Sequence, residues 1–168
     1  MHFLAQDEAN FLETKLRRQM VSQPTPKLVL YYESGERDYS DAANAITASI
    51  GDFTEANLHF AFCVSGDGWN EGTATNERWS RYRRWRGANG ENRRLYDAPG
   101  HQFEPGEAEE LSKVIEFALQ LGWDALVAAE PGRQLLLLSH DDRIEIYRGF
   151  EWPSLAEKLI RLGYWRRQ

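Results

Sequence analysis

The chain has 168 residues, a length that usually forms one domain and buries roughly two thirds of the surface exposed by the unfolded chain. Hydrophobic residues make up 42% and charged residues 27%, a composition that excludes an intrinsically disordered chain. No apolar run approaches the roughly 18 residues of a membrane span, and the first residues carry no signal-peptide pattern. The single cysteine, Cys63, cannot form an internal disulfide. We therefore expect a soluble, cytoplasmic protein that makes no membrane contact.

Charge is unevenly distributed along the sequence. The chain has 20 basic and 26 acidic residues, a net charge of −6, which argues against a general nucleic-acid binder. Segment 78–94 reverses this balance, because it holds seven arginines and one acid, Glu91, and the rest of the chain therefore carries −12. Arginine binds carboxylates and phosphates through a planar fork and stacks on aromatic rings. The segment is therefore typical of oriented contacts.

The first half of the sequence alternates helical and strand patterns. Apolar residues at mostly helical spacings, with acids early and arginines late, predict a helix from about Phe3 to Val21. Two prolines then end the pattern, and apolar, β-prone runs follow at 28–32 and 58–64. Between these runs, segment 40–51 has a helical pattern that a glycine closes. We interpret this order as a β-α-β unit.

Residues 65–106 lack a core periodicity and are rich in glycine, arginine and tryptophan. An irregular insertion of this length is usually functional or disordered. Its middle fits either a helix over about 76–86 or a hairpin with a turn at Asn89-Gly90. The hairpin would place Arg86 opposite Arg93, and like charges disfavour that pairing. We therefore expect the helix.

The second half of the sequence predicts two more helices. One has a continuous apolar stripe and ends at Leu121, with Gly122 in the left-handed closing position. Several glutamates precede it, where the helix dipole favours negative charge. The other has Pro153 in its first turn and Gly163 as its stop.

Three short strand-like runs separate these helices, and the connections between them are short enough to make them antiparallel neighbours. The runs are Asp124–Ala129, Gln134–Ser139 and Arg143–Arg148. Leu135–Leu138 is apolar on both faces, which predicts the central strand and a core position for all four leucines. The last run alternates, so that one face is expected to meet solvent through Arg143, Glu145 and Tyr147.

These elements predict a single α+β domain over residues 1–168. Its mixed sheet would have about five strands, two from the N-terminal β-α-β unit and three from the C-terminal antiparallel meander. About four helices would cover this sheet, and the irregular insertion would occupy about 65–106.

Catalytic and metal-binding patterns are weak. The cluster His140, Asp141 and Asp142 could serve acid-base chemistry or bind a metal, but these residue types also suit the hairpin turn on which they are expected to lie. The glycine-rich segment 66–72 fits neither a calcium loop nor a phosphate loop, and Cys63 has the surroundings of a buried small hydrophobe. We expect no catalytic residue, no metal site and no cofactor.

The strongest candidate surface is segment 78–86, RWSRYRRWR, because Trp, Tyr and Arg are enriched at binding hot spots. The candidate partner-binding residues are Arg78, Trp79, Arg81, Tyr82, Arg83, Arg84, Trp85 and Arg86. Two interpretations remain open. The helix could present these residues to a partner, or its aromatic side could pack on the domain while its arginines pair with Glu104, Glu107, Glu109, Glu110 or other acids of the same chain.

The composition and the candidate surface together favour a small non-enzymatic protein that binds another macromolecule, as an inhibitor, immunity or adaptor protein does. The expected partner is another protein or a second copy of the chain, and a nucleic acid is disfavoured by the net charge. The alternative is a small enzyme or anion-binding protein that uses His140, Asp141 and Asp142 together with arginines.

Overall fold

A computed structural model describes residues 1–22, 25–33, 38–60, 77–130, 134–149 and 152–166, with only the backbone described at 77–79 and 152. In these residues seven strands form one sheet, in the order β1-β4-β3-β5-β6-β7-β2. The strands are β1 (His2–Leu4), β2 (Leu28–Tyr31), β3 (Glu55–Phe60), β4 (Gly100–Phe103), β5 (Ala125–Glu130), β6 (Gln134–Ser139) and β7 (Arg143–Arg148). The α+β class is confirmed.

Every neighbouring pair in this sheet is antiparallel, so the prediction of a mixed sheet with about five strands is wrong. The expected β-α-β unit corresponds to β2 and β3. These two strands run in the same direction, but β5, β6 and β7 lie between them. The C-terminal meander forms as predicted, with β6 at its centre.

The two strands that the sequence did not predict are short and lie at one edge of the sheet. β1 and β4 have three and four residues and pair with each other, and β4 also pairs with β3. A Cβ atom at Gly100 would lie 2.9 Å from Leu4 Cβ, so the close approach of the two backbones requires glycine there. β4 lies within 65–106, so residues 100–103 of the predicted insertion belong to the sheet.

Five helices are described, one more than predicted. They are α1 (Gln6–Val21), α2 (Ser40–Ile50), α3 (Glu77–Ala88), α4 (Ala108–Leu121) and α5 (Trp152–Arg161), and a short 3-10 turn, η1, spans Leu95–Asp97. The predicted stop of α4 is confirmed, because Gly122 has φ 62° and the Trp123 N–H donates to Ala118 O at 3.1 Å. Among the described helices, none combines the length and the apolar character that crossing a membrane would need.

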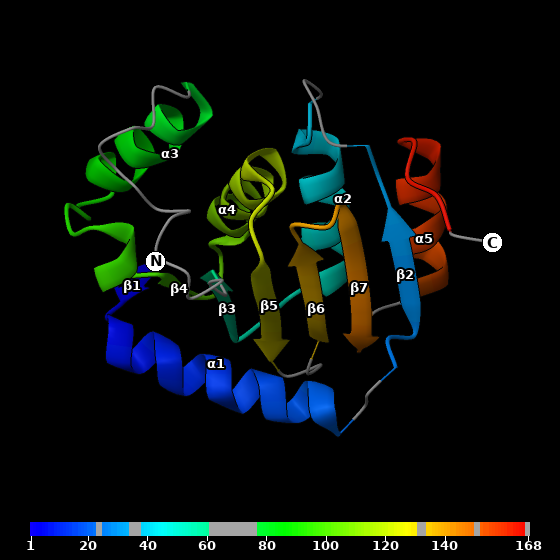
Figure 1. Cartoon of the computed structure of the whole chain (residues 1–168), viewed down its shortest axis with the longest axis horizontal. Helices are drawn as coiled ribbons and strands as arrows, with labels where there is room; N and C mark the ends of the chain where they lie inside the picture. The colour runs from blue at the N-terminus through cyan, green and yellow to red at the C-terminus, as the bar shows by residue number, and fades with distance from the viewer. Residues whose placement is uncertain (23–24, 34–37, 61–76, 131–133, 150–151, 167–168) are drawn as a thin grey trace.

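Helices lie on both faces of the sheet (Figure 1). α2, α4 and α5 contribute to the main core with alternate strand residues such as Val127 and Leu136. α1 crosses the other face, where Leu16 packs with Leu126 and Tyr147. Successive strand residues therefore contribute to two separate apolar layers.

The second layer corrects two predictions about the meander. Tyr147 and Glu145 are buried, although the alternation predicts that they face solvent. Tyr147 packs in the α1 layer, and its hydroxyl donates to Glu145 Oε2 at 2.5 Å. Leu135, Leu136 and Leu138 are core residues as expected, whereas Leu137 is half-buried.

Candidate anion-binding cavity

The arginine-rich segment forms helix α3, so the expected helix is confirmed and the hairpin alternative is wrong. Gly90 has φ 82° just after the helix, and the Glu91 N–H donates back to Arg86 O at 2.9 Å. The chain therefore reverses as a helix-terminating turn. Arg86 and Arg93 do approach each other, but through a hydrogen bond from Arg86 Nη2 to Arg93 O at 3.3 Å.

The aromatic side of α3 packs on the domain. Tyr82 has an exposed fraction of 0%, and its ring centroid lies 5.7 Å from that of Phe60 and 5.2 Å from that of Phe117. Trp85 is half-buried against the same core. Tyr82 therefore cannot be a surface contact, which corrects that part of the predicted binding surface. The side chains of Arg78 and Trp79 lie outside the description.

Arg81 joins α3 to α4. Its Nη1 lies 3.4 Å from Glu116 Oε1, and its guanidinium carbon lies 5.8 Å from the centroid of the Phe117 ring. This ion pair agrees with an intramolecular role for this arginine, with Glu116 as the acid of the same chain. Arg81 does not line the cavity described next.

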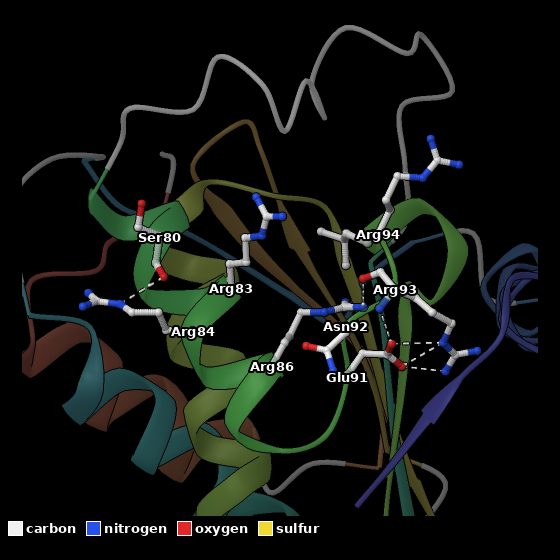
Figure 2. Close-up of a pocket in the computed structure, with 9 residues that line it drawn as sticks. Ser80, Arg83, Arg84, Arg86, Glu91, Asn92, Arg93 and Arg94 are labelled. Carbon is white, nitrogen blue, oxygen red and sulfur yellow. Dashed lines mark hydrogen bonds and ion pairs between the residues drawn. The ribbon is translucent and has the colours of Figure 1, made fainter.

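The remaining described arginines of the segment surround one cavity of about 400 Å³. Its side chains come from α3 and from the segment that follows the helix (Figure 2). The lining residues are Ser80, Arg83, Arg84, Arg86, Glu91, Asn92, Arg93, Arg94 and Leu95. The lining thus includes five arginines and a single carboxylate.

That carboxylate belongs to a local ion pair. Arg93 donates to Glu91 from Nε at 3.0 Å and from Nη2 at 2.5 Å, and the Arg93 backbone N–H donates to Glu91 Oε1 at 2.7 Å. Burial alone would raise the pKa of Glu91, but these hydrogen bonds outweigh burial and lower it. Glu91 therefore stays ionised and makes its ion pair with Arg93, and the nearby charge of Arg86 also favours the ionised form.

The other exposed arginines of the cavity differ in whether a carboxylate pairs with them. Arg94 pairs with Asp97, with 2.9 Å from Nε to Oδ2. Arg84 donates from Nε to Ser80 O at 3.3 Å, which satisfies a donor without neutralising the charge. Among the described residues, Arg83 has no hydrogen bond or ion pair. The cavity therefore keeps an excess of positive charge.

Arg86 is the one buried arginine of this group, with an exposed fraction of 3%. Its Nη1 donates to Tyr82 Oη at 3.2 Å and to Ala98 O at 3.0 Å, and its guanidinium carbon lies 5.3 Å from the centroid of the Phe3 ring. Within the described part of the chain, no carboxylate lies within ion-pair distance of it. Its position is thus fixed by neutral acceptors and a ring face.

A buried polar chain continues from Arg86 into the sheet. Tyr82 Oη lies 3.0 Å from Nε2 of His101, which is fully buried on β4. Burial, followed by the Arg86 charge, lowers the pKa of His101 well below its usual value. The imidazole is therefore neutral, and the Tyr82 hydroxyl, which accepts from Arg86, can donate to Nε2. These contacts connect Arg86 to the sheet.

The His140 cluster lies at the β6–β7 turn, as expected of turn residues. His140 Nδ1 lies 2.9 Å from Asp124 Oδ2, and its Nε2 lies 3.4 Å from Asp141 Oδ1. Asp142 has φ 57°, the left-handed conformation of a tight turn. None of these residues lines the arginine cavity. Cys63 and the glycine-rich segment 66–72 lie outside the described residues.

We expect that His140→Ala leaves the free energy of unfolding nearly unchanged. The hydrogen bond to Asp124 raises the pKa of His140, so this contribution is present below the unfolded pKa near 6.5 and is lost as pH rises through the folded pKa. The side chain is 53% exposed, which limits the contribution to less than about 1 kcal/mol. Urea unfolding of wild type and variant at pH 5.5 and pH 8 measures the contribution of the His140–Asp124 hydrogen bond. A variant that loses more unfolding free energy at pH 8 than at pH 5.5 would contradict this contribution.

The sequence pointed to this region but to a different set of residues. The candidate residues followed the aromatic spacing of one helix, whereas the cavity also uses residues beyond its end, among them Asn92, Arg93 and Arg94. The useful signal was the charge of segment 78–94, which includes both of these arginines.

Comparisons of this chain with protein-family models, with curated proteins and with solved structures find no match. What the cavity can bind must therefore be inferred from its own residues.

Proposed function

We propose that this chain is a non-enzymatic binding protein whose partner inserts an acidic segment into the arginine cavity. The observation that carries the proposal is the composition of the lining, because five arginines and one carboxylate line a cavity of about 400 Å³. Opposite charges that meet across an interface accelerate encounter and select the partner.

The exposed members of the cavity support docking from solution. Arg83, Arg84, Arg93 and Arg94 are all exposed, so a partner can reach them. Tyr96 follows this group with an exposed fraction of 54%. Arginine and tyrosine are enriched among residues that dominate binding energies.

The charge of the rest of the chain favours this one point of contact. Outside segment 78–94 the chain carries −12, which repels an acidic partner from other surfaces. An acidic partner is therefore directed to the cavity. The acidic segment could also belong to a second copy of the chain, and the oligomeric state tests that case.

The experiment measures binding of a fluorescent peptide rich in glutamate to wild type and to the Arg83→Glu, Arg84→Glu double variant. We expect the double variant to lose at least about tenfold in affinity, since two like charges replace two attractive ones. The wild-type affinity should fall as salt rises from about 0.05 to 0.5 M, because the Debye length shortens over that range. The melting temperature should stay unchanged, because both side chains are exposed.

The matched control replaces Arg18 and Arg161 by glutamate. Both arginines are exposed, on α1 and α5, and neither lines the cavity. Both double variants change the net charge equally, so only a site effect separates them. Equal losses in the two variants, or no peptide binding by wild type, would refute the proposal. Sedimentation at both salt concentrations completes the test, since a dimer that only the Arg83, Arg84 variant dissociates would identify a second copy as the partner.

A further inference from the structure

We infer that the group which the cavity receives is a phosphate monoester on the partner, seated on the guanidinium of Arg86. This inference rests on the proposed function, because it names the anion that the acidic partner supplies. Phosphate and carboxylate both bind arginine, and the two are distinguished here by the number of charges and by the fixed donors.

The number of arginines without an ion pair favours the phosphate. Glu91 pairs with Arg93 and Asp97 pairs with Arg94, whereas Arg83, Arg84 and Arg86 have no ion pair among the described residues. One carboxylate supplies a single negative charge to three guanidinium groups. A phosphate monoester supplies about −2 near neutral pH and three terminal oxygens that accept hydrogen bonds. It therefore matches this lining more closely.

The buried arginine supplies the fixed donors. A guanidinium has five N–H groups, and Arg86 uses two on Nη1, for Tyr82 Oη and Ala98 O, and one on Nη2, for Arg93 O. The Nε–H and one Nη2–H make no hydrogen bond within the described part of the chain. Arg86 lines the cavity, and we assign these two N–H groups to the occupant. Each can donate to an oxygen of a phosphate.

Tyr82 and His101 act as positioning residues for this guanidinium. The Tyr82 hydroxyl accepts from Arg86 Nη1, and the neutral His101 holds that hydroxyl from the other side at 3.0 Å. The donors of Arg86 are therefore oriented before the anion arrives. Preorganised donors reduce the entropy that binding costs.

The remaining lining argues against a nucleotide. Leu95 is the one apolar residue among the described residues of the cavity, and no aromatic ring lines it there. Cavities that hold organic ligands are mostly apolar, and single-stranded nucleic acids stack their bases on aromatic rings. The favoured occupant is therefore the phosphate group itself, carried on a peptide.

The test compares two fluorescent peptides of equal length and equal net charge, one with phosphoserines and one with glutamates only. We expect the phosphopeptide to bind wild type at least about tenfold tighter, because its oxygens use the fork of Arg86 as well as the general positive charge. Pyrophosphate and citrate, added as competitors, show whether the preference belongs to phosphate alone. A single-stranded oligonucleotide is measured in parallel.

The matched variants are Arg86→Lys and Arg83→Lys, which keep the charge and remove the fork. Arg86→Lys should abolish most of the preference for the phosphopeptide while the glutamate peptide still binds. Arg83→Lys, at an exposed position that tolerates substitution, should reduce the preference to a smaller extent and keeps the test valid if Arg86→Lys unfolds. Circular dichroism checks the fold of both variants.

Each result decides between the two proposals. Equal affinities for the two peptides would overturn the phosphate inference and leave the proposed function standing, whereas binding of neither peptide would overturn both. If pyrophosphate binds as tightly as the phosphopeptide, the ligand is a free phosphate compound, and the assignment of the phosphate to a peptide partner is overturned. Tighter binding of the oligonucleotide than of the phosphopeptide would overturn the choice of a monoester.

Discussion

We expect Leu136→Asp to abolish folding. Leu136 lies on β6 with an exposed fraction of 0%, and its strand partners are Val127 and Ile146. The substitution removes a buried leucine, which costs about 2–5 kcal/mol, and adds the desolvation of a carboxylate without a partner. The total reaches the 5–15 kcal/mol that stabilises a typical domain. Circular dichroism should show no cooperative thermal transition.

The control uses a milder change at two adjacent leucines. Leu136→Thr and Leu137→Thr exchange the same atoms, but Leu137 is half-buried on the α1 side of the sheet. We expect the loss of unfolding free energy to be larger at position 136 than at position 137, since the cost follows the apolar area removed from water. Equal losses would show that the two faces of β6 are equally buried. A cooperatively melting Leu136→Asp variant would refute the placement of β6 in the core.

Local patterns predicted the elements better than they predicted the pairing of strands. The stop at Gly122 and the strand over Leu135–Leu138 depend on local chemistry, and both were confirmed, with three of the four leucines in the core. The neighbours of β2 and β3 depend on contacts between residues distant in sequence, and the order of strands cannot be read from periodicity. β1 and β4 were missed because three or four residues do not establish an alternation.

The burial of Glu145 and Tyr147 shows a second limit. Their alternation with isoleucines is the pattern of a strand with one solvent-facing side. In the structure α1 covers that side, and Tyr147 satisfies its hydroxyl through Glu145. A polar residue that finds a hydrogen-bond partner can be buried, and the sequence does not show whether a helix from the other end of the chain will cover it.

The sequence could predict the positive charge of the cavity but not the positions of its side chains. Seven arginines in segment 78–94 indicate an anion site, yet their side chains separate into different surroundings. Arg81 pairs with α4, Arg83 is exposed, and Arg86 is buried. This separation depends on how α3 packs against Phe3 and the sheet, which spacing along one helix cannot show.

The second large effect is expected for Arg86→Met. Methionine keeps the aliphatic packing but cannot donate, so the buried Ala98 carbonyl loses its hydrogen bond from Nη1 and the Tyr82 hydroxyl loses a donor. The buried Ala98 carbonyl left without this donor costs about 1–3 kcal/mol, whereas the Tyr82 hydroxyl keeps its contact with His101. Removing the buried charge also removes its desolvation cost, which offsets part of this loss. We expect a net loss of about 1–2 kcal/mol, measured by urea unfolding.

Arg84→Met is the matched control, because it makes the same exchange two residues away on the same helix. Arg84 is exposed and donates only to Ser80 O at 3.3 Å, so its loss should change the unfolding free energy by no more than about 0.5 kcal/mol. A similar stability for the two variants would mean that the polar chain through Tyr82 and His101 does not hold Arg86. A selective loss at Arg86 would establish that the guanidinium is fixed by the fold before any anion binds, which the seating of a phosphate requires.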